Sequence, residues 1–274
     1  MALSLSACGT GSGDPLADAQ SAYAANDFRG ARIYLMTALK ENSSDPEANL
    51  LYGKTLLRLG DGVAAEAAFK KLSPIKKYQA ELAPLMAHAL LLRGMPKRAL
   101  TLVQEIPAEH ASIGYWVKSR SLLDLKREDE AVLAIGQGLQ SAPNDPALLA
   151  LRGTYEITQR NISAAKRTAA LALKNGPNNL DALLLAGQIA LMQQDLAGAK
   201  THYNKALKLY PDTIVSLFSL AAVNADLGNQ KEAKTGLKRV LELAPGHPMA
   251  LFLMAKISFN DGNVERAQDL MQAA

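Results

Sequence analysis

The sequence has little of what several classes of protein need. It holds one cysteine in 274 residues, which excludes an intrachain disulfide and a multi-cysteine metal site. Aromatic residues make up 5% with a single Trp, which is poor for stacking on nucleic-acid bases, and the net charge of +4 is too small to indicate a polyanionic partner. No uninterrupted apolar run reaches the roughly 18–20 residues of a membrane span. What remains is a soluble chain rich in alanine and leucine, and we expect it to be helical.

Alanine, small residues and proline recur along the chain with a period of 34 residues, a signal that outranks any length-based domain count. The alanine column keeps this period except for one step of 32, from Ala99 to Ala131: Ala31, Ala65, Ala99, Ala131, Ala165, Ala199, Ala233, Ala267. A column of small residues lies twelve positions earlier: Ala19, Gly53, Ala87, Ser119, Gly153, Gly187, Ala221, Ala255. A proline column occupies the second half: Pro143, Pro177, Pro211, Pro245.

Each repeat is predicted to be a helical hairpin. In one unit, residues 181–192 and 196–209 both carry apolar residues three and four apart, as a helix with one buried face requires. The break between the helices is commonly glycine followed by Asp or Asn, at Gly60, Gly228 and Gly262. Glycine adopts the left-handed backbone of a helix end, and Asp or Asn caps the next helix. Small residues are expected where the two helices touch, and proline is expected to stop the second helix.

These columns resemble the tetratricopeptide (TPR) repeat. The resemblance covers residues 13–274, in units near 12–45, 46–79, 80–111, 112–145, 146–179, 180–213, 214–247 and 248–274. It implies an all-α, right-handed superhelical solenoid of about eight hairpins, with a concave groove lined by the first helix of each. Pro74 is expected to end one helix early, and Pro84 is expected to lie in the first turn of the next. The final helix is predicted over residues 264–274. Its uncovered apolar side predicts that the array continues past Ala274; the alternative is that a partner covers that end.

The N-terminal residues Leu5-Ser6-Ala7-Cys8 resemble a bacterial lipobox, in which the cysteine is acylated. Residues 1–12 are interpreted as the remnant of a lipoprotein signal with a Gly/Ser tether, and Cys8 as the lipidation site. A secretory signal has a basic start, which is missing here, so we expect Met1 to be internal to a longer signal. Gly9 after the cysteine implies outer-membrane sorting by the same resemblance. The alternative is a chance Ser-Ala-Cys in an unstructured tail.

No pattern for catalysis, cofactor binding or metal binding is present. The four histidines fall in four different repeats, and none has a second ligand three or four residues away. There is no nucleophile elbow, phosphate loop or zinc-protease motif. The sequence therefore predicts a protein that is not an enzyme and carries no cofactor.

The TPR resemblance instead directs attention to side chains of the first helices, which line the groove in that family. The candidates are Glu47, Lys54, Arg58, His88, Trp116, Arg120, Thr154, Gln188, Phe218, Asp226, Phe252, Lys256 and Asn260. The first half is basic, which favours an acidic or C-terminal peptide near Lys54, Arg58 and Arg120. The alternative is that these cations are solvated helix faces and that Trp116 is packing.

A lipobox followed closely by a TPR array resembles the TPR lipoproteins of exosortase (PEP-CTERM) exopolysaccharide systems. That resemblance implies a non-catalytic protein–protein interaction scaffold of the bacterial cell envelope, at the outer membrane facing the periplasm, which assists exopolysaccharide export or protein sorting. The expected partner is a protein or peptide in the groove; the membrane is expected only through a lipid on Cys8, and nucleic acid is not expected. Alternatives are a cytoplasmic TPR adaptor or co-chaperone, a TPR lipoprotein of type IV pilus assembly, and a regulatory part of a larger enzyme.

Overall fold

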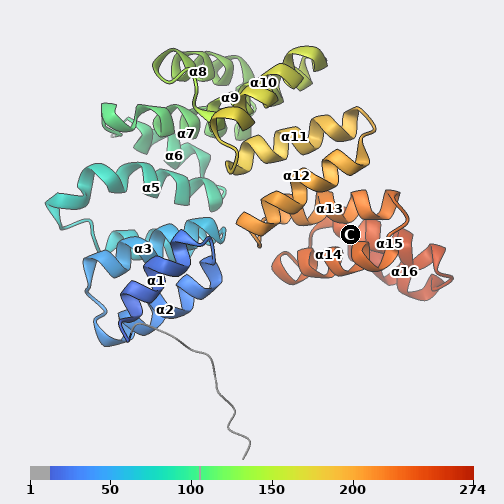
Figure 1. The fold of residues 1–274 in the computed structure, drawn as a ribbon, viewed down its shortest axis with the longest axis horizontal. Coiled ribbons are helices and arrows are strands. Elements are labelled where there is room, and N and C mark those ends of the chain that lie inside the picture. Colours follow the sequence, from blue (N-terminus) through green and yellow to red (C-terminus); the bar gives the residue numbers. More distant parts are fainter. Residues whose placement is uncertain (1–12, 105) are drawn as a thin grey trace, which may run out of the picture. The chain divides into compact units, whose positions relative to one another are not determined.

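The computed structural model describes residues 13–104 and 106–274, which contain sixteen α-helices, two short 3-10 helices and no strand (Figure 1). Consecutive helices pair as antiparallel hairpins, each with a first and a second helix. In this described part, no helix is both long enough and apolar enough to cross a membrane. The chain divides into two compact units, which are described separately: unit 1 ends at residue 105 and unit 2 begins at Ile106.

Unit 1 holds three hairpins, α1 (Pro15–Ala24) with α2 (Phe28–Glu41), α3 (Pro46–Arg58) with α4 (Gly62–Lys70), and α5 (Gln79–Leu92) with α6 (Pro96–Val103). Unit 2 holds five, α7 (Ala111–Asp124) with α8 (Glu128–Ser141), α9 (Pro146–Thr158) with α10 (Ile162–Asn175), α11 (Leu180–Met192) with α12 (Leu196–Leu209), α13 (Ile214–Asp226) with α14 (Gln230–Leu243), and α15 (Pro248–Asn260) with α16 (Val264–Gln272). The 3-10 helices are η1 (Lys76–Tyr78) and η2 (Ala108–His110). The predicted hairpins are confirmed, and the last helix ends two residues earlier than expected.

The alanine and small columns lie where the two helices of a hairpin touch. Every member of the alanine column is buried, on a second helix. On the first helices, a Cβ added to Gly53 would come within 2.2 Å of the Phe69 ring, and one added to Gly187 within 2.6 Å of the Tyr203 ring. A methyl group there overlaps the neighbouring ring, so the period reflects the space available between helices.

The turn inside each hairpin has one backbone conformation. A single residue there has positive φ, at Asn26, Gly60, Gly94, Lys126, Arg160, Gln194, Gly228 and Gly262. The next residue often caps the second helix: Asp61 accepts from the backbone N–H of Ala64, and Asn263 from that of Arg266. Asn229 does not, which corrects that part of the prediction, because its side chain donates to Asn224 instead.

Proline ends the second helices as predicted in the later repeats. Helices α8, α10, α12 and α14 each end two residues before a proline of the column, and α4 ends four residues before Pro74. A proline restricts the residue before it and cannot donate the next helical hydrogen bond.

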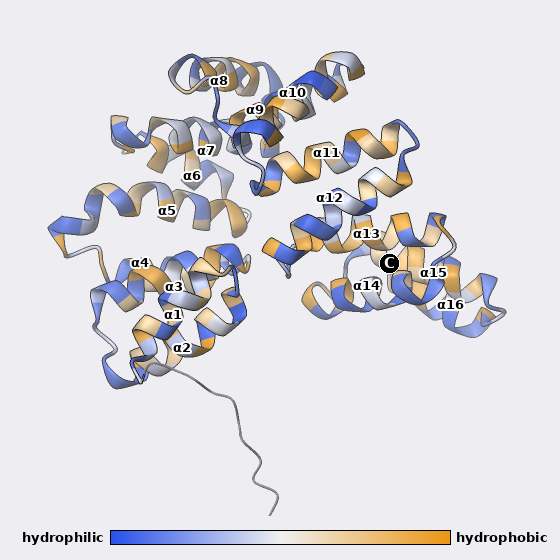
Figure 2. Cartoon of the chain, in the orientation of Figure 1, coloured by the Kyte–Doolittle hydropathy of each residue, from blue (hydrophilic) through white to orange (hydrophobic). Residues whose placement is uncertain are grey.

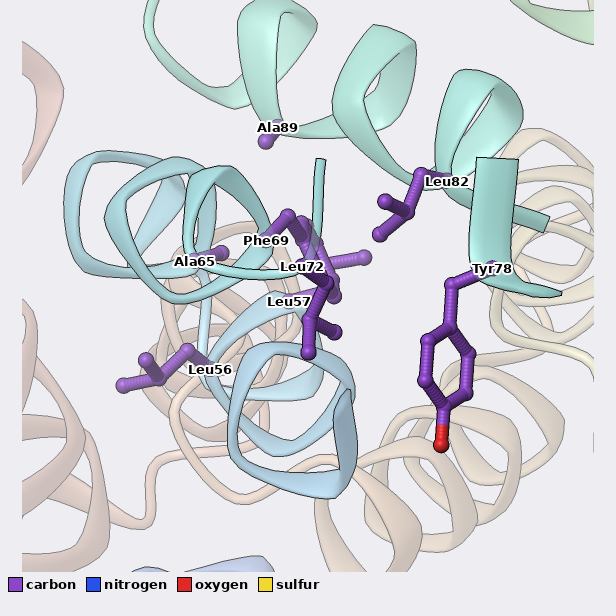
Figure 3. Close-up of a cluster of buried hydrophobic side chains, with 8 residues drawn as sticks. All are labelled: Leu56, Leu57, Ala65, Phe69, Leu72, Tyr78, Leu82 and Ala89. Atoms are coloured by element: carbon purple, nitrogen blue, oxygen red, sulfur yellow. The ribbon is translucent and has the colours of Figure 1, made fainter. Parts of the chain in front are cut away.

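Pro84 contradicts the prediction that it lies in a first turn. It stands inside α5, which begins at Gln79 after the 3-10 turn Lys76–Tyr78. The buried side chains of Tyr78 and Leu82 hold this early segment against Leu57 and Phe69 in the core of unit 1 (Figure 3). Burial of these apolar groups therefore outweighs the single helical hydrogen bond that proline removes.

The one irregular step of the period has a structural counterpart. Between Ala99 and Ala131, where the spacing falls to 32, the chain passes from unit 1 to unit 2. Helix α6 is the shortest α-helix of the described residues, with eight residues against fourteen in α8. The shortened repeat thus marks the boundary between the two units.

Candidate functional site

The sequence-predicted groove residues all lie on first helices. Lys54 and Arg58 are on α3, His88 on α5, Trp116 and Arg120 on α7, Gln188 on α11, Phe218 and Asp226 on α13, and Phe252, Lys256 and Asn260 on α15. We call the surface formed by these positions the first-helix face, and treat it within each unit separately. Cys8 lies outside the described residues.

In unit 1 the charged candidates have partners within the unit. The Nζ atom of Lys54 lies 2.5 Å from Oε1 of Glu81, so the ammonium of α3 pairs with a carboxylate of α5. The Arg58 guanidinium lies over the Phe28 ring, 5.1 Å from its centroid, a cation–π contact. Both cations therefore contact partners within unit 1.

His88 is the titratable group of unit 1 whose pKa changes most. Burial, together with the nearby positive charge of Arg58, lowers its pKa from 6.5 to about 4. The imidazole is therefore neutral at pH 7.

In unit 2 a hydrogen bond joins two first helices that are separated by a third. The indole Nε1 of Trp116 on α7 donates to Oδ2 of Asp181 on α11, at 3.1 Å, and α9 contacts both helices. The nearby Asp145 caps α9 by accepting from the backbone N–H groups of Ala147 and Leu148. We call the Trp116–Asp181 contact the indole–carboxylate bridge.

The charge state of the bridge follows from its surroundings. Burial raises the pKa of Asp181, and the negative charge of Asp145 adds to the rise. The positive charge of Arg120 and the hydrogen bond from Trp116 act in the opposite direction. Arg120 also lies 3.7 Å from Asp124 on its own helix. Trp116 and Arg120 are thus tied to acidic neighbours.

The last two hairpins present a different first-helix face, because it is largely apolar. Val215 and Met249 are each 56% exposed and Phe252 is 48% exposed, while Phe218 is half-buried. The Phe218 ring lies 5.4 Å from the ring of His247, the residue that caps α15. We call Val215, Phe218, Met249 and Phe252 the apolar strip.

Further polar candidates of unit 2 lie on α11, α13 and α15. Gln188, Asp226, Lys256 and Asn260 are all exposed. Lys256 follows Phe252 by one helical turn, and Asn260 follows Lys256 by another, so both lie on the same side of α15. An apolar centre with a polar edge is the usual composition of a surface that binds protein.

Among residues 13–104 and 106–274, no group of three or more His, Cys, Asp or Glu side chains could hold a metal ion.

Part of the chain matches a known repeat family, and its fold matches solved structures. Residues 16–80 and 151–213 match the tetratricopeptide repeat family model. No curated protein matches the sequence. Among solved structures, a chain of the APC/C hetero-tetramer Cut9–Hcn1 aligns with 94% of this chain at 14% identity and a TM-score of 0.64. A chain of the human IFIT1 dimer with m7Gppp-AAAA aligns with 93% at 16% identity and a TM-score of 0.65.

The fold is a solenoid of TPR hairpins. The chain spans 55% of the Cut9–Hcn1 chain and 66% of the IFIT1 chain that it matches. At these identities the likeness establishes the fold alone. TPR hairpins are an architecture of protein-interaction scaffolds, which generally bind peptides or proteins.

Sequence reasoning missed several residues of the first-helix face. Glu81, Asp181, Val215 and Met249 all occupy the TPR register of Glu47, one repeat or several repeats further along. Extending the Glu47 position by the repeat spacing would have found them. The bridge itself had no such signal, because its two residues occupy different registers in different repeats.

Proposed function

We propose that this chain is a non-catalytic scaffold that holds a partner protein segment on the apolar strip of unit 2. The observation that carries the proposal is the exposure of Val215, Met249 and Phe252 on consecutive first helices. Apolar side chains at this density lose contact with water when a partner covers them, at roughly 25 cal/mol per Å² of apolar area. An aromatic residue at the centre of such a patch is a typical source of binding energy.

The chemistry of the strip defines the partner segment. Aliphatic and aromatic side chains of the partner would pack on Met249 and Phe252, while Lys256 and Asn260 would bind polar groups at the edge. The basic candidates are less suited to primary recognition. Lys54 and Arg58 belong to unit 1 and Arg120 to unit 2, and each already contacts a neighbour in its own unit.

Photo-crosslinking in cells tests the strip directly. A photoreactive phenylalanine at Phe252 should give an adduct of defined mass, and the same adduct should form from Phe218. The matched control is Leu171, an apolar residue that is 39% exposed on the second helix α10. Adducts at Leu171 equal to those at Phe252, or none at Phe252, would contradict the proposal.

We further propose that the scaffold is an envelope lipoprotein acylated at Cys8, which assists exopolysaccharide export or protein sorting at the outer membrane. The support is the Leu5-Ser6-Ala7-Cys8 sequence, the Gly/Ser-rich residues that follow it, and the TPR array beginning at α1. A lipid at this position would place the array at a membrane surface, where the strip could hold a component of an export or sorting assembly.

Metabolic palmitate labelling of the native gene product tests the anchor. Wild-type protein should be labelled and should fractionate with membranes, whereas Cys8→Ala protein should be unlabelled and soluble. Unlabelled wild-type protein in the cytosol would discard the envelope assignment. That result would leave a cytoplasmic TPR adaptor that uses the same apolar strip.

A further inference from the structure

The outward face of α2 combines basic and aliphatic side chains in one stripe. Arg29, Arg32, Ile33, Met36 and Lys40 follow each other at helical spacing, so all five lie on one side of the helix. All are exposed, Ile33 by 65% and Met36 by 53%. An adjacent side of the helix, with Phe28, Ala31 and Leu35, is fully buried in unit 1. Hydrophilic and hydrophobic residues mix accordingly along α2 in Figure 2.

Acidic side chains are absent from this stripe. The one acidic residue within α2 is Glu41 at its last position, to the side of the stripe. Basic residues that flank exposed aliphatic ones are typical of a helix that lies in the interface of an anionic bilayer. The aliphatic groups enter the boundary of the acyl chains, and each nearby Lys or Arg adds to the attraction to the negative surface.

The position of α2 in the chain agrees with binding to a bilayer. Seven residue steps separate Cys8 from Pro15, where α1 begins, and they span at most about 25 Å. A lipid on Cys8 would therefore keep the first hairpin, α1 and α2, close to the bilayer. We propose that the α2 stripe binds the anionic surface of that bilayer as a second anchor; the inference rests on the lipid proposed for Cys8.

Helix α10 provides a matched control. Lys166 and Lys174 occupy the same repeat positions as Arg32 and Lys40, but Arg167 and Ala170 stand at the positions of Ile33 and Met36. The two helices therefore share the basic character, and α2 alone of the pair has two aliphatic side chains within the stripe.

The test uses the full chain with Cys8→Ala, which removes any lipid, and sedimentation with vesicles. Vesicles of phosphatidylcholine and phosphatidylglycerol at 3:1 should bind the protein in low salt, and pure phosphatidylcholine vesicles should not. Arg32→Glu with Lys40→Glu should lower the partition coefficient about tenfold or more. Ile33→Ser with Met36→Ser should lower it about threefold or more, and Lys166→Glu with Lys174→Glu less than about twofold.

Three outcomes would overturn the inference. They are no binding to the anionic vesicles, an equal loss on charge reversal in α10, and a serine variant that binds as well as the wild type. The last would identify a general polyanion site. All replaced side chains are exposed, so the variants should fold, and circular dichroism checks this. Because the test protein carries no lipid, its result is independent of the palmitate labelling that tests Cys8.

Discussion

The first-helix faces of the two units use one backbone register in opposite ways. In unit 1 the face is charged, and its charged side chains contact partners in the same unit. Lys54 pairs with Glu81, and the Arg58 guanidinium lies over the Phe28 ring. At the end of unit 2, the positions equivalent to Glu81 hold Val215 and Met249, which are exposed, as is Phe252 one turn further along α15. Register alone therefore does not make a TPR surface a binding surface. The difference lies in whether neighbouring repeats supply partners for the side chains.

A second comparison, within unit 2, gives the physical reason. Trp116 and Phe252 occupy equivalent positions in their repeats. The indole N–H of Trp116 donates to Asp181 across the intervening α9. Phe252 has no polar atom and remains about half exposed. One aromatic residue is therefore used in the internal structure, whereas the other remains exposed on the strip that we propose binds a partner.

The largest loss of stability should come from substitutions at the close contacts between the two helices of a hairpin, a feature that each unit has. Gly53→Ala and Gly187→Ala should each destabilise the protein by about 2–3 kcal/mol, because the new methyl group overlaps the Phe69 or Tyr203 ring. Urea denaturation followed by circular dichroism measures this. Gly136→Ala is the control: its Cβ meets no atom within 4 Å, and it should stabilise the helix by about 0.5–1 kcal/mol. Similar behaviour of all three variants would refute the packing argument.

The stability of the protein should depend on pH through His88, which lies in unit 1. His88 has a folded pKa of about 4, below its ordinary value of 6.5, so the unfolded chain binds this proton more readily. Stability should therefore fall as the pH is lowered from 6.5 to 4, by about 2 kcal/mol from this group. His88→Gln should lose that part of the dependence in unfolding curves collected across the window. An unchanged dependence would mean that His88 has the same pKa in the folded and the unfolded protein.

The hydrogen bond of the indole–carboxylate bridge should stabilise the fold, which distinguishes Trp116 from Phe252, a side chain with no polar atom. Asp181→Ala removes the acceptor of the Trp116 N–H and should cost about 1–2 kcal/mol. Asp181→Asn keeps an acceptor oxygen without the charge whose burial is unfavourable, and should stay within about 0.5 kcal/mol of the wild type. Thermal denaturation compares the two. A larger cost for Asn than for Ala would exclude the hydrogen bond as the stabilising contact.

The smallest effect should come from the ion pair of unit 1. The Lys54 and Glu81 side chains are 31% and 39% exposed, so water screens their attraction. A double-mutant cycle with Lys54→Met and Glu81→Gln should give a coupling of about 0.5 kcal/mol or less, which decreases in high salt. A coupling above about 1.5 kcal/mol would show that the pair is a structural element of unit 1.

Much of the fold could be predicted from the sequence, because its causes are local. The period of small residues fixes the sites of close helix approach, and a proline two residues after a helix ends it in α8, α10, α12 and α14. Pro84 is the exception that shows the limit. Its effect on α5 depends on the burial of Tyr78 and Leu82 in a core built from other helices, which a local rule does not include.

The candidate site could likewise be predicted from the sequence only in part. The sequence by itself determined the all-α hairpins and the residues that share the first-helix register, because these follow from spacing along one chain. Only the tertiary structure decided which of those residues are paired, as with Lys54 and Trp116, and which remain exposed, as with Phe252. Pairing joins residues from different repeats, 27 and 65 positions apart in these two cases, and depends on the distances that helix packing sets.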